Sequence, residues 1–307
     1  MRLLPADLHL GTRTSVTAQW TALGRALELT REPSARIVSD PLAPLFLDRV
    51  HRQVLRGAAA GPAGVRHTLE RSEFTAIATS ALCRHRAIDA ALLETLPEVD
   101  QVVVLGAGYD TRAHRFATAI GRRPVFEVDL APMSRQKAAV VAARPRAFRS
   151  RQVVRVETDF AARPLRTALV SAGFRPGSRT FVAWEGVTMY LPQASVRATL
   201  DDLAAVCGSG STLAADFFRR VPGVHPVDIV RRAAGDSLRL VGEPLRYEPD
   251  PDVAEAVLAG CGFEVVDLAD GDQLTRRHAT GGRRCDAALY VVKALSNSST
   301  RRSISPR

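Results

Sequence analysis

The sequence predicts an α/β protein whose mostly parallel, seven-stranded sheet carries helices on both faces. Two observations predict it. From Gln101 onward, short apolar runs rich in β-branched residues alternate with stretches of helical periodicity, as in successive βαβ units. The first run, Gln101–Leu105, leads directly into Gly106 and Gly108, and Gly-x-Gly after a strand is typical of a turn that approaches a nucleotide.

The alternation assigns the elements of this core in order. We expect strands at residues 101–105, 124–128, 152–157, 180–184, 211–216, 263–268 and 287–293. We expect helices at residues 111–119, 132–143, 162–172, 193–207 and 252–260. No helix separates the last two strands, which favours a hairpin-like final pair. The connection 217–251 is too long for an ordinary loop and predicts a lid or binding loop.

Residues 1–97 are expected to form a helical cap packed on this core. Apolar residues at helical spacing predict three helices there. They are expected at Thr14–Thr30, Leu42–Arg56 and Phe74–Leu96. Residues 98–294 form the expected core, and the Ser/Arg-rich residues 295–307 lack apolar periodicity, so we expect a disordered tail.

Composition indicates an ordinary globular protein. Of 307 residues, 46% are hydrophobic, and no run approaches the ~20 apolar residues of a membrane span. We see no signal peptide and expect a cytoplasmic protein without a membrane partner. The four cysteines, Cys83, Cys207, Cys261 and Cys285, form no CxxC pair, so we expect free thiols and no metal site.

The formal net charge of +10 rests almost entirely on arginine, because Lys137 and Lys293 are the only lysines. The cations are scattered along the chain and are not interleaved with aromatic residues. We therefore attribute the excess to compositional drift and do not expect a nucleic-acid partner. An RNA-associated cofactor-binding module remains an alternative that only this charge supports.

The residues after the glycines indicate which nucleotide is bound. A dinucleotide fingerprint has a third glycine where this chain has Thr111, preceded by Asp110. A carboxylate beside a pyrophosphate is repelled, whereas beside a sulfonium and an α-amino group it is favourable. Asp129 ends the second expected strand, where it can accept hydrogen bonds from both ribose hydroxyls. These residues favour S-adenosylmethionine over NAD, although an NAD-type oxidoreductase remains an alternative.

Further groups of residues follow in order along the chain. They are Ala35–Ala43, Arg84–Asp89, Gln101–Arg112, Phe126–Leu130 with Lys137, and Trp184–Leu191. Together they resemble the leucine carboxyl methyltransferase-like family of S-adenosylmethionine-dependent enzymes, over about Thr14 to Lys293. The resemblance implies the Rossmann-like sheet of class I methyltransferases.

The resemblance also implies a role for individual cofactor-binding residues. Arg84 resembles the arginine that pairs with the methionine carboxylate, for which a bidentate guanidinium is well suited. Gly106 and Gly108 allow the close backbone approach, and Asp129 resembles the ribose-binding acid. Asp110 completes this group beside the sulfonium.

The same resemblance assigns residues further along the chain. Asp159 and Phe160 resemble the pair that binds adenine. Glu185 ends the fourth expected strand and is expected near the cofactor amine and the methyl group, where an unpaired buried carboxylate would otherwise be costly. Glu185 and Tyr190 are the catalytic candidates, with Tyr190 facing the acceptor.

Acceptor contacts are expected in the lid region, at Arg219, Arg220 and His225. The lone His114, between Arg112 and Arg115, is expected at the surface. Arg86 and Asp89 are three residues apart on one expected helix, where they can pair with each other.

The predicted reaction is methyl transfer to a carboxylate or hydroxyl of a small molecule, such as a natural product. A carboxylate is already ionised at neutral pH and needs no general base, whereas a phenol would need one, with Tyr190 or His225 as candidates. A protein carboxyl methyltransferase is an alternative. The acceptor and the oligomeric state stay open.

Overall fold

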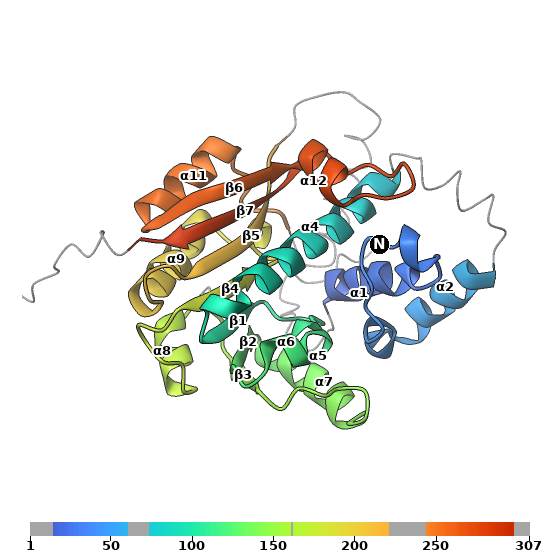
Figure 1. Ribbon diagram of the computed structural model, residues 1–307, viewed down its shortest axis with the longest axis horizontal. Coiled ribbons are helices and arrows are strands. Elements are labelled where there is room, and N and C mark those ends of the chain that lie inside the picture. The colour runs from blue at the N-terminus through green and yellow to red at the C-terminus, as the bar shows by residue number, and fades with distance from the viewer. Residues whose placement is uncertain (1–14, 61–73, 161, 221–243, 298–307) are drawn as a thin grey trace, which may run out of the picture.

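The computed structural model describes residues 15–60, 74–160, 162–220 and 244–297. Its centre is a seven-stranded sheet in the order β3-β2-β1-β4-β5-β7-β6 (Figure 1). The strands are β1 (Gln101–Leu105), β2 (Val125–Asp129), β3 (Val153–Glu157), β4 (Thr180–Trp184), β5 (Thr212–Phe218), β6 (Phe263–Asp270) and β7 (Leu289–Ser296). Strands β1 to β5 pair in parallel, and β7 lies antiparallel between β5 and β6. The predicted fold class is confirmed.

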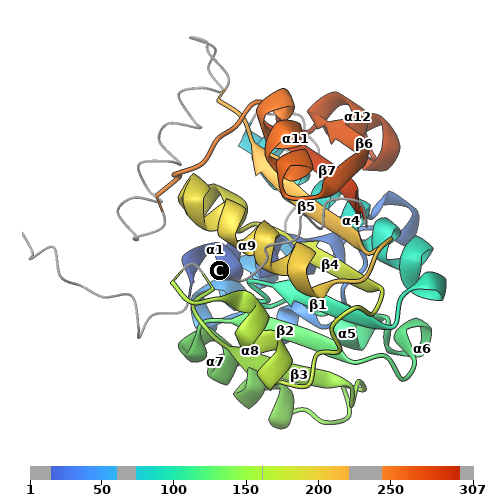
Figure 2. The same ribbon diagram turned by 90° about the vertical axis from the view of Figure 1, so that its left-hand side faces the viewer.

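Helices cover both faces of the sheet (Figure 2). On one face lie α8 (Leu165–Ser171), α9 (Gln193–Val206) and α11 (Pro251–Gly260); on the other lie α4 (Phe74–Thr95), α5 (Arg112–Arg115), α6 (Ala117–Ile120) and α12 (Gly271–His278). Alternate residues of β1 enter the two cores, Val103 and Leu105 on the first face and Val102 and Val104 on the second. A strand buried on both faces explains why this run is continuously apolar.

The N-terminal segment packs beside the carboxyl ends of the strands. It contains α1 (Val16–Glu28), η1 (Pro33–Ala35), η2 (Ala43–Phe46) and α2 (Arg49–Ala60). The short helix η3 (Leu96–Glu98) lies between α4 and β1. Together with α7 (Ala131–Ala142), α1 and η2 bury a third apolar cluster around Tyr109. The Phe46 ring stacks on the Tyr109 ring with centroids 4.9 Å apart, and the Gln19 amide donates to the Tyr109 hydroxyl at 3.2 Å. These contacts place α1 against the turn that follows β1.

Several expected element boundaries were wrong. The expected helix at 42–56 is a 3-10 turn, η2, followed by α2 from Arg49, because Pro44 and the extended Leu47 interrupt it. The expected helix at 111–119 is two four-residue helices that meet at Phe116, whose backbone is not helical.

The C-terminal third also differs from the expectation. Helix α12 was missed, although its capping box, in which Asp270 and Gln273 satisfy each other's backbone N–H, is a recognisable start signal. Strand β5 continues to Phe218, into the expected lid, and β7 continues to Ser296, into the expected tail. Residues 221–243 of the expected lid lie outside the described residues.

Within the described ranges, no helix combines the length and apolar character needed to cross a lipid bilayer.

Candidate active site

A cavity of about 1000 Å³ lies at the carboxyl ends of β1, β2 and β4. Strands β2 and β4 leave β1 on opposite sides, and ligands of doubly wound sheets bind at such a switch point. All the cofactor-binding candidates and Tyr190 line this cavity. They are Arg84, Gly106, Gly108, Asp110, Asp129, Asp159, Phe160, Glu185 and Tyr190.

The turn after β1 forms one wall of the cavity and depends on its two glycines. Gly106 and Gly108 have positive φ angles of 62° and 37°. A Cβ atom on Gly106 would lie 2.3 Å from Cγ2 of Val187. This position therefore requires glycine for its backbone conformation and for the available space.

Asp129 ties this turn to the end of β2. Its carboxylate accepts from the Gly108 N–H at 2.6 Å and from the Leu130 N–H at 2.7 Å. Burial raises the pKa of Asp129, although these two N–H groups and the Lys137 ammonium oppose the shift. Asp129 is thus a half-buried acceptor at the cavity wall, held by its own backbone neighbours.

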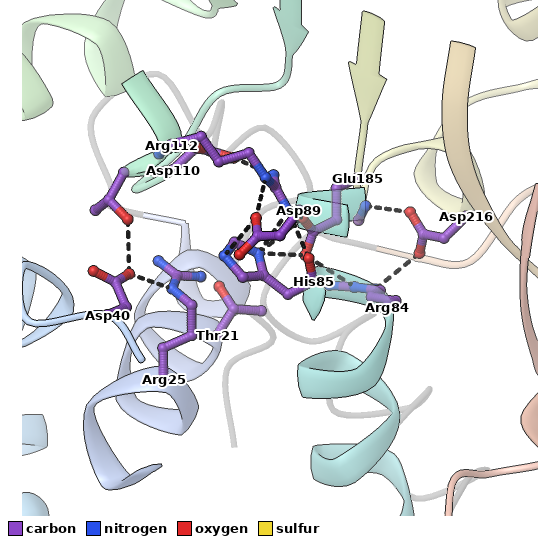
Figure 3. A network of polar contacts seen from close by, with 12 residues as sticks. Thr21, Arg25, Asp40, Arg84, His85, Asp89, Asp110, Arg112, Glu185 and Asp216 are labelled. Atoms are coloured by element: carbon purple, nitrogen blue, oxygen red, sulfur yellow. Dashed lines mark hydrogen bonds and ion pairs between the residues drawn. The ribbon is translucent and has the colours of Figure 1, made fainter. Parts of the chain in front are cut away.

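A buried charged network surrounds Glu185 on the opposite wall (Figure 3). The Glu185 carboxylate accepts from Arg112 Nη2 at 2.6 Å and from Arg84 Nε at 3.4 Å, and it lies 2.9 Å from His85 Nδ1. Arg84 also donates to Asp216 at 2.9 Å. We call this set the Glu185 network. Its members are Arg25, Asp40, Arg84, His85, Asp89, Asp110, Arg112, Arg115, Glu185 and Asp216.

The Glu185 network contains one more carboxylate than it contains guanidinium groups. Every side chain in it is at most 13% exposed, and it contains four guanidinium groups and five carboxylates. Burial raises the pKa of Asp216, but both of its oxygens accept hydrogen bonds, from Arg84 and from the Gly186 N–H, so we count it as ionised. One negative charge is therefore left beside the cavity when His85 is neutral.

His85 is neutral in this arrangement. Burial lowers its pKa, and the neighbouring Arg112 charge lowers it further. Guanidinium groups lie near both ring nitrogens, Arg115 2.8 Å from Nε2 and Arg112 3.0 Å from Nδ1. The Glu185 carboxylate lies 2.9 Å from Nδ1 and can only accept, so we assign the ring proton to Nδ1. Burial opposes ionisation of Glu185, but the hydrogen bond from His85 and the charges of Arg112 and Arg84 outweigh it and hold its pKa well below the usual range. A carboxylate whose pKa is held so low is a weak base at neutral pH.

Asp110 and Thr111 take different places at the end of the turn. Asp110 lines the cavity and accepts from the backbone N–H and the guanidinium of Arg112. Thr111 is fully buried and donates its hydroxyl to Asp40 at 2.8 Å. Where a dinucleotide fingerprint has its third glycine, this chain thus uses a threonine to attach the N-terminal segment.

The residues expected to contact the acceptor are only partly brought together. Tyr190 lies on η4 (Thr188–Tyr190) and lines the cavity. Arg219 and Arg220 do not line it, since Arg219 donates to the Ala287 carbonyl and Arg220 lies 3.6 Å from Glu248. His225 lies outside the described residues. Arg246, which the sequence did not single out, lines the cavity, and its N–H donates to the Met189 carbonyl at 2.7 Å beside Tyr190.

Two expectations about individual side chains were wrong. His114 is buried, because its ring packs edge-on against Phe148 and its Nδ1 accepts from the Ser150 N–H. Burial lowers the pKa of His114 to about 4. Arg86 is exposed and does not pair with Asp89, which instead binds Arg112 and Arg115 from α5.

Several members of the Glu185 network were missed at the sequence level. Asp216 carried a usable signal, because an acid near the carboxyl end of a strand had already pointed to Asp129 and Glu185. For His85 and Arg112 no such signal exists, since their partners are 100 and 73 residues away in the chain.

Comparison with known proteins identifies the family. The sequence profile of leucine carboxyl methyltransferases matches residues 18–204. The chain belongs to the leucine carboxyl methyltransferase family. It is 32% identical over 216 residues to a Mycobacterium tuberculosis protein named "Putative S-adenosyl-L-methionine-dependent methyltransferase", covering 68% of this chain and 67% of that protein. A protein of the same name from Mycobacterium avium is 29% identical over 273 residues, covering 86% of this chain and 84% of the other.

Solved structures share the fold of this methyltransferase. A DUF574 family protein from Streptomyces avermitilis superposes with a TM-score of 0.57 at 13% identity, over 89% of this chain and 96% of the other. A Bordetella parapertussis protein gives a TM-score of 0.53 at 16% identity, over 97% of this chain and 100% of the other. The protein is thus an S-adenosylmethionine-dependent methyltransferase with a Rossmann-like sheet, and the alternative of an NAD-type oxidoreductase is rejected.

Among the residues that the structure describes, no group of three or more His, Cys, Asp or Glu side chains is arranged to hold a metal ion. The four cysteines are free thiols.

Proposed function

We propose that this methyltransferase transfers the methyl group of S-adenosylmethionine to an oxygen of a small molecule, with a carboxylate as the preferred acceptor. The volume of the cavity carries the proposal. At about 1000 Å³ it lies at the upper end of the ~300–1,000 Å³ range of small-molecule sites, so one cavity has space for the cofactor and a small acceptor.

The two walls of the cavity suit the two ends of the cofactor. Bound S-adenosylmethionine supplies a methyl group activated by its sulfonium charge. The unbalanced negative charge of the Glu185 network favours a cation beside it, and the cofactor carries two cationic groups, its ammonium and its sulfonium. Arg84 is suited to form an ion pair with the methionine carboxylate, and Asp129 is suited to accept hydrogen bonds from the ribose hydroxyls. Asp159 and Phe160 fit the adenine end.

The chemistry of the lining residues favours a carboxylate acceptor over a phenol. A phenol needs a general base, but Glu185 has a strongly lowered pKa, and His85 has both ring nitrogens engaged with Glu185 and Arg115. A carboxylate needs none, so catalysis rests on alignment and on exclusion of water. Tyr190 and Arg246 both line the cavity, and we expect them to orient the acceptor, the first by its hydroxyl and the second by its charge.

Asp129→Ala tests the cofactor-binding part of the proposal. We expect the affinity for S-adenosylhomocysteine to fall by roughly 100-fold, because hydrogen bonds to a charged acceptor contribute about 1.5–3 kcal/mol each and 1.4 kcal/mol is a factor of ten. Calorimetric titration of the purified variant measures it. Asp267→Ala, at an exposed ion pair with Arg277, is the control and should bind as the wild type does. Equal affinity in both variants would contradict the ribose assignment.

The acceptor class is tested by methyl transfer from S-[methyl-³H]adenosylmethionine. Carboxylic acids, phenols and peptides with a free C-terminus are offered in parallel, and products are separated by size. We expect label on small carboxylic acids, released as methanol by mild base because esters hydrolyse and ethers do not. Label confined to peptides would instead favour a protein carboxyl methyltransferase, which the family name also suggests. Base-stable label would indicate a hydroxyl acceptor.

A further inference from the structure

Lys137 on α7 is an unusual cation in this chain. Lysine and arginine together number 42, yet only two of them are lysines, so nearly every cationic position holds arginine. Of the two lysines, Lys293 is partly exposed and pairs with Glu94 at the surface. Lys137 is 2% exposed and does not line the cavity. Compositional drift toward arginine has thus left a lysine at a fully buried position.

The Lys137 ammonium joins β2 to the turn after β1. Its Nζ lies 3.0 Å from Glu127 Oε1 and donates to the Ala107 carbonyl at 3.4 Å. Glu127 is also buried, and its second carboxylate oxygen has no hydrogen-bond partner among the described residues. The Asp110 N–H donates to the same Ala107 carbonyl at 2.7 Å. Ala107 stands between the two glycines of the turn.

One rigid peptide unit connects this lysine to the cavity. The carbonyl of Ala107 and the N–H of Gly108 belong to the same planar trans peptide, so they point in opposite directions. Lys137 binds the carbonyl on one side, and Asp129 accepts the N–H on the other at 2.6 Å. The orientation of this peptide therefore determines where the Asp129 carboxylate lies.

We propose that Lys137 is a positioning residue for the cofactor: by holding the Ala107 carbonyl it orients the glycine turn and Asp129, and so sets the affinity for S-adenosylmethionine without touching it. A compact ammonium can donate to Glu127 and Ala107 at once. A guanidinium is planar and larger, so we expect it to meet Glu127 and Ala107 with a different geometry. This difference would favour lysine over arginine at the position.

The test separates the ion pair from the bond to Ala107. Glu127→Gln removes the charge pair and keeps the lysine on the Ala107 carbonyl. The double variant Glu127→Gln/Lys137→Met loses both. We expect Glu127→Gln to bind S-adenosylhomocysteine within about threefold of the wild type. The double variant should bind it on the order of tenfold more weakly, because the glycine turn and Asp129 are no longer held in the binding orientation. Calorimetric titration measures affinity, and Tm without ligand measures stability.

Two controls complete the comparison. Lys293→Met removes the other lysine and should leave affinity unchanged. Lys137→Arg keeps a cation for Glu127, so this variant should still fold and unfold cooperatively. Because the cation is misplaced relative to the Ala107 carbonyl, the variant should bind S-adenosylhomocysteine more weakly than the wild type. It therefore tests the proposal even where the double variant does not fold. Equal weakening in Glu127→Gln and the double variant would mean that only the ion pair matters. Wild-type affinity in Lys137→Arg or in the double variant would equally overturn the proposal.

Discussion

Replacing Glu185 with glutamine is expected to abolish methyl transfer. The amide is neutral, so the negative charge beside the cavity disappears, and Arg84 and Arg112 lose their shared partner. Removing one partner of a buried ion pair destabilises a protein by about 3–5 kcal/mol. We also expect the affinity for S-adenosylmethionine to fall by roughly 100-fold, because a charge-assisted contact and the balance of the network are lost together.

Binding and stability can be measured separately for this variant. Calorimetric titration well below the Tm of the variant gives the affinity, and thermal unfolding gives the stability. Glu98→Gln is the matched control, since Glu98 pairs with Arg179 at the surface and is 67% exposed. The control should retain wild-type affinity, because exposed pairs contribute about 0–1 kcal/mol. Retention of wild-type affinity by Glu185→Gln would remove Glu185 from the cofactor site.

Gly106→Ala is expected to have the second largest effect. An L-residue with positive φ costs about 1–2 kcal/mol. The added Cβ would also lie 2.3 Å from Val187 Cγ2, and relieving that overlap costs about 1–3 kcal/mol more. The turn must therefore shift, and Asp129 shifts with it. We expect a lower Tm and at least roughly tenfold weaker binding of S-adenosylhomocysteine.

Gly173→Ala isolates the backbone contribution. Gly173 has a φ of +92°, but a Cβ there would meet nothing within 4 Å. It should lower the Tm and leave cofactor affinity unchanged. Combining Gly106→Ala with Val187→Ala removes the overlap, so part of the lost affinity should return. If Gly106→Ala and Gly173→Ala behave alike, close packing against Val187 plays no part in cofactor binding.

Local patterns predicted the core of the fold well. The run Gln101–Leu105 and the run 180–184 were placed to the residue, because a strand buried on both faces is continuously apolar and bounded by turn residues. Helices were less accurate where short-range signals conflict. Pro44 and Leu47 divided one expected helix, and Phe116 divided another, because tertiary contacts outweigh weak helical propensity.

The candidate site divides in the same way. The strand-end acids and the glycines were visible because each follows directly from its own strand. Tyr190 was also correctly expected at the cavity, but the arginine was not, since Arg219 and Arg220 were expected there and Arg246 lines it instead. The backbone N–H of Arg246 donates to the Met189 carbonyl in η4, and no local sequence pattern predicts that long-range contact.

The sequence by itself thus determined the positions of the strands along the chain, the glycine turn, the cofactor class and the strand-end carboxylates, because hydrophobic periodicity and backbone conformation act over a few residues. Only the tertiary structure decided which charges neutralise one another. Arg84 and Arg112 come from α4 and α5, Glu185 directly follows β4, and Asp216 lies in β5. Burial makes their pairing obligatory, since an isolated buried charge is too costly. The same folding buried Lys137 beneath the glycine turn, where one peptide plane connects it to Asp129.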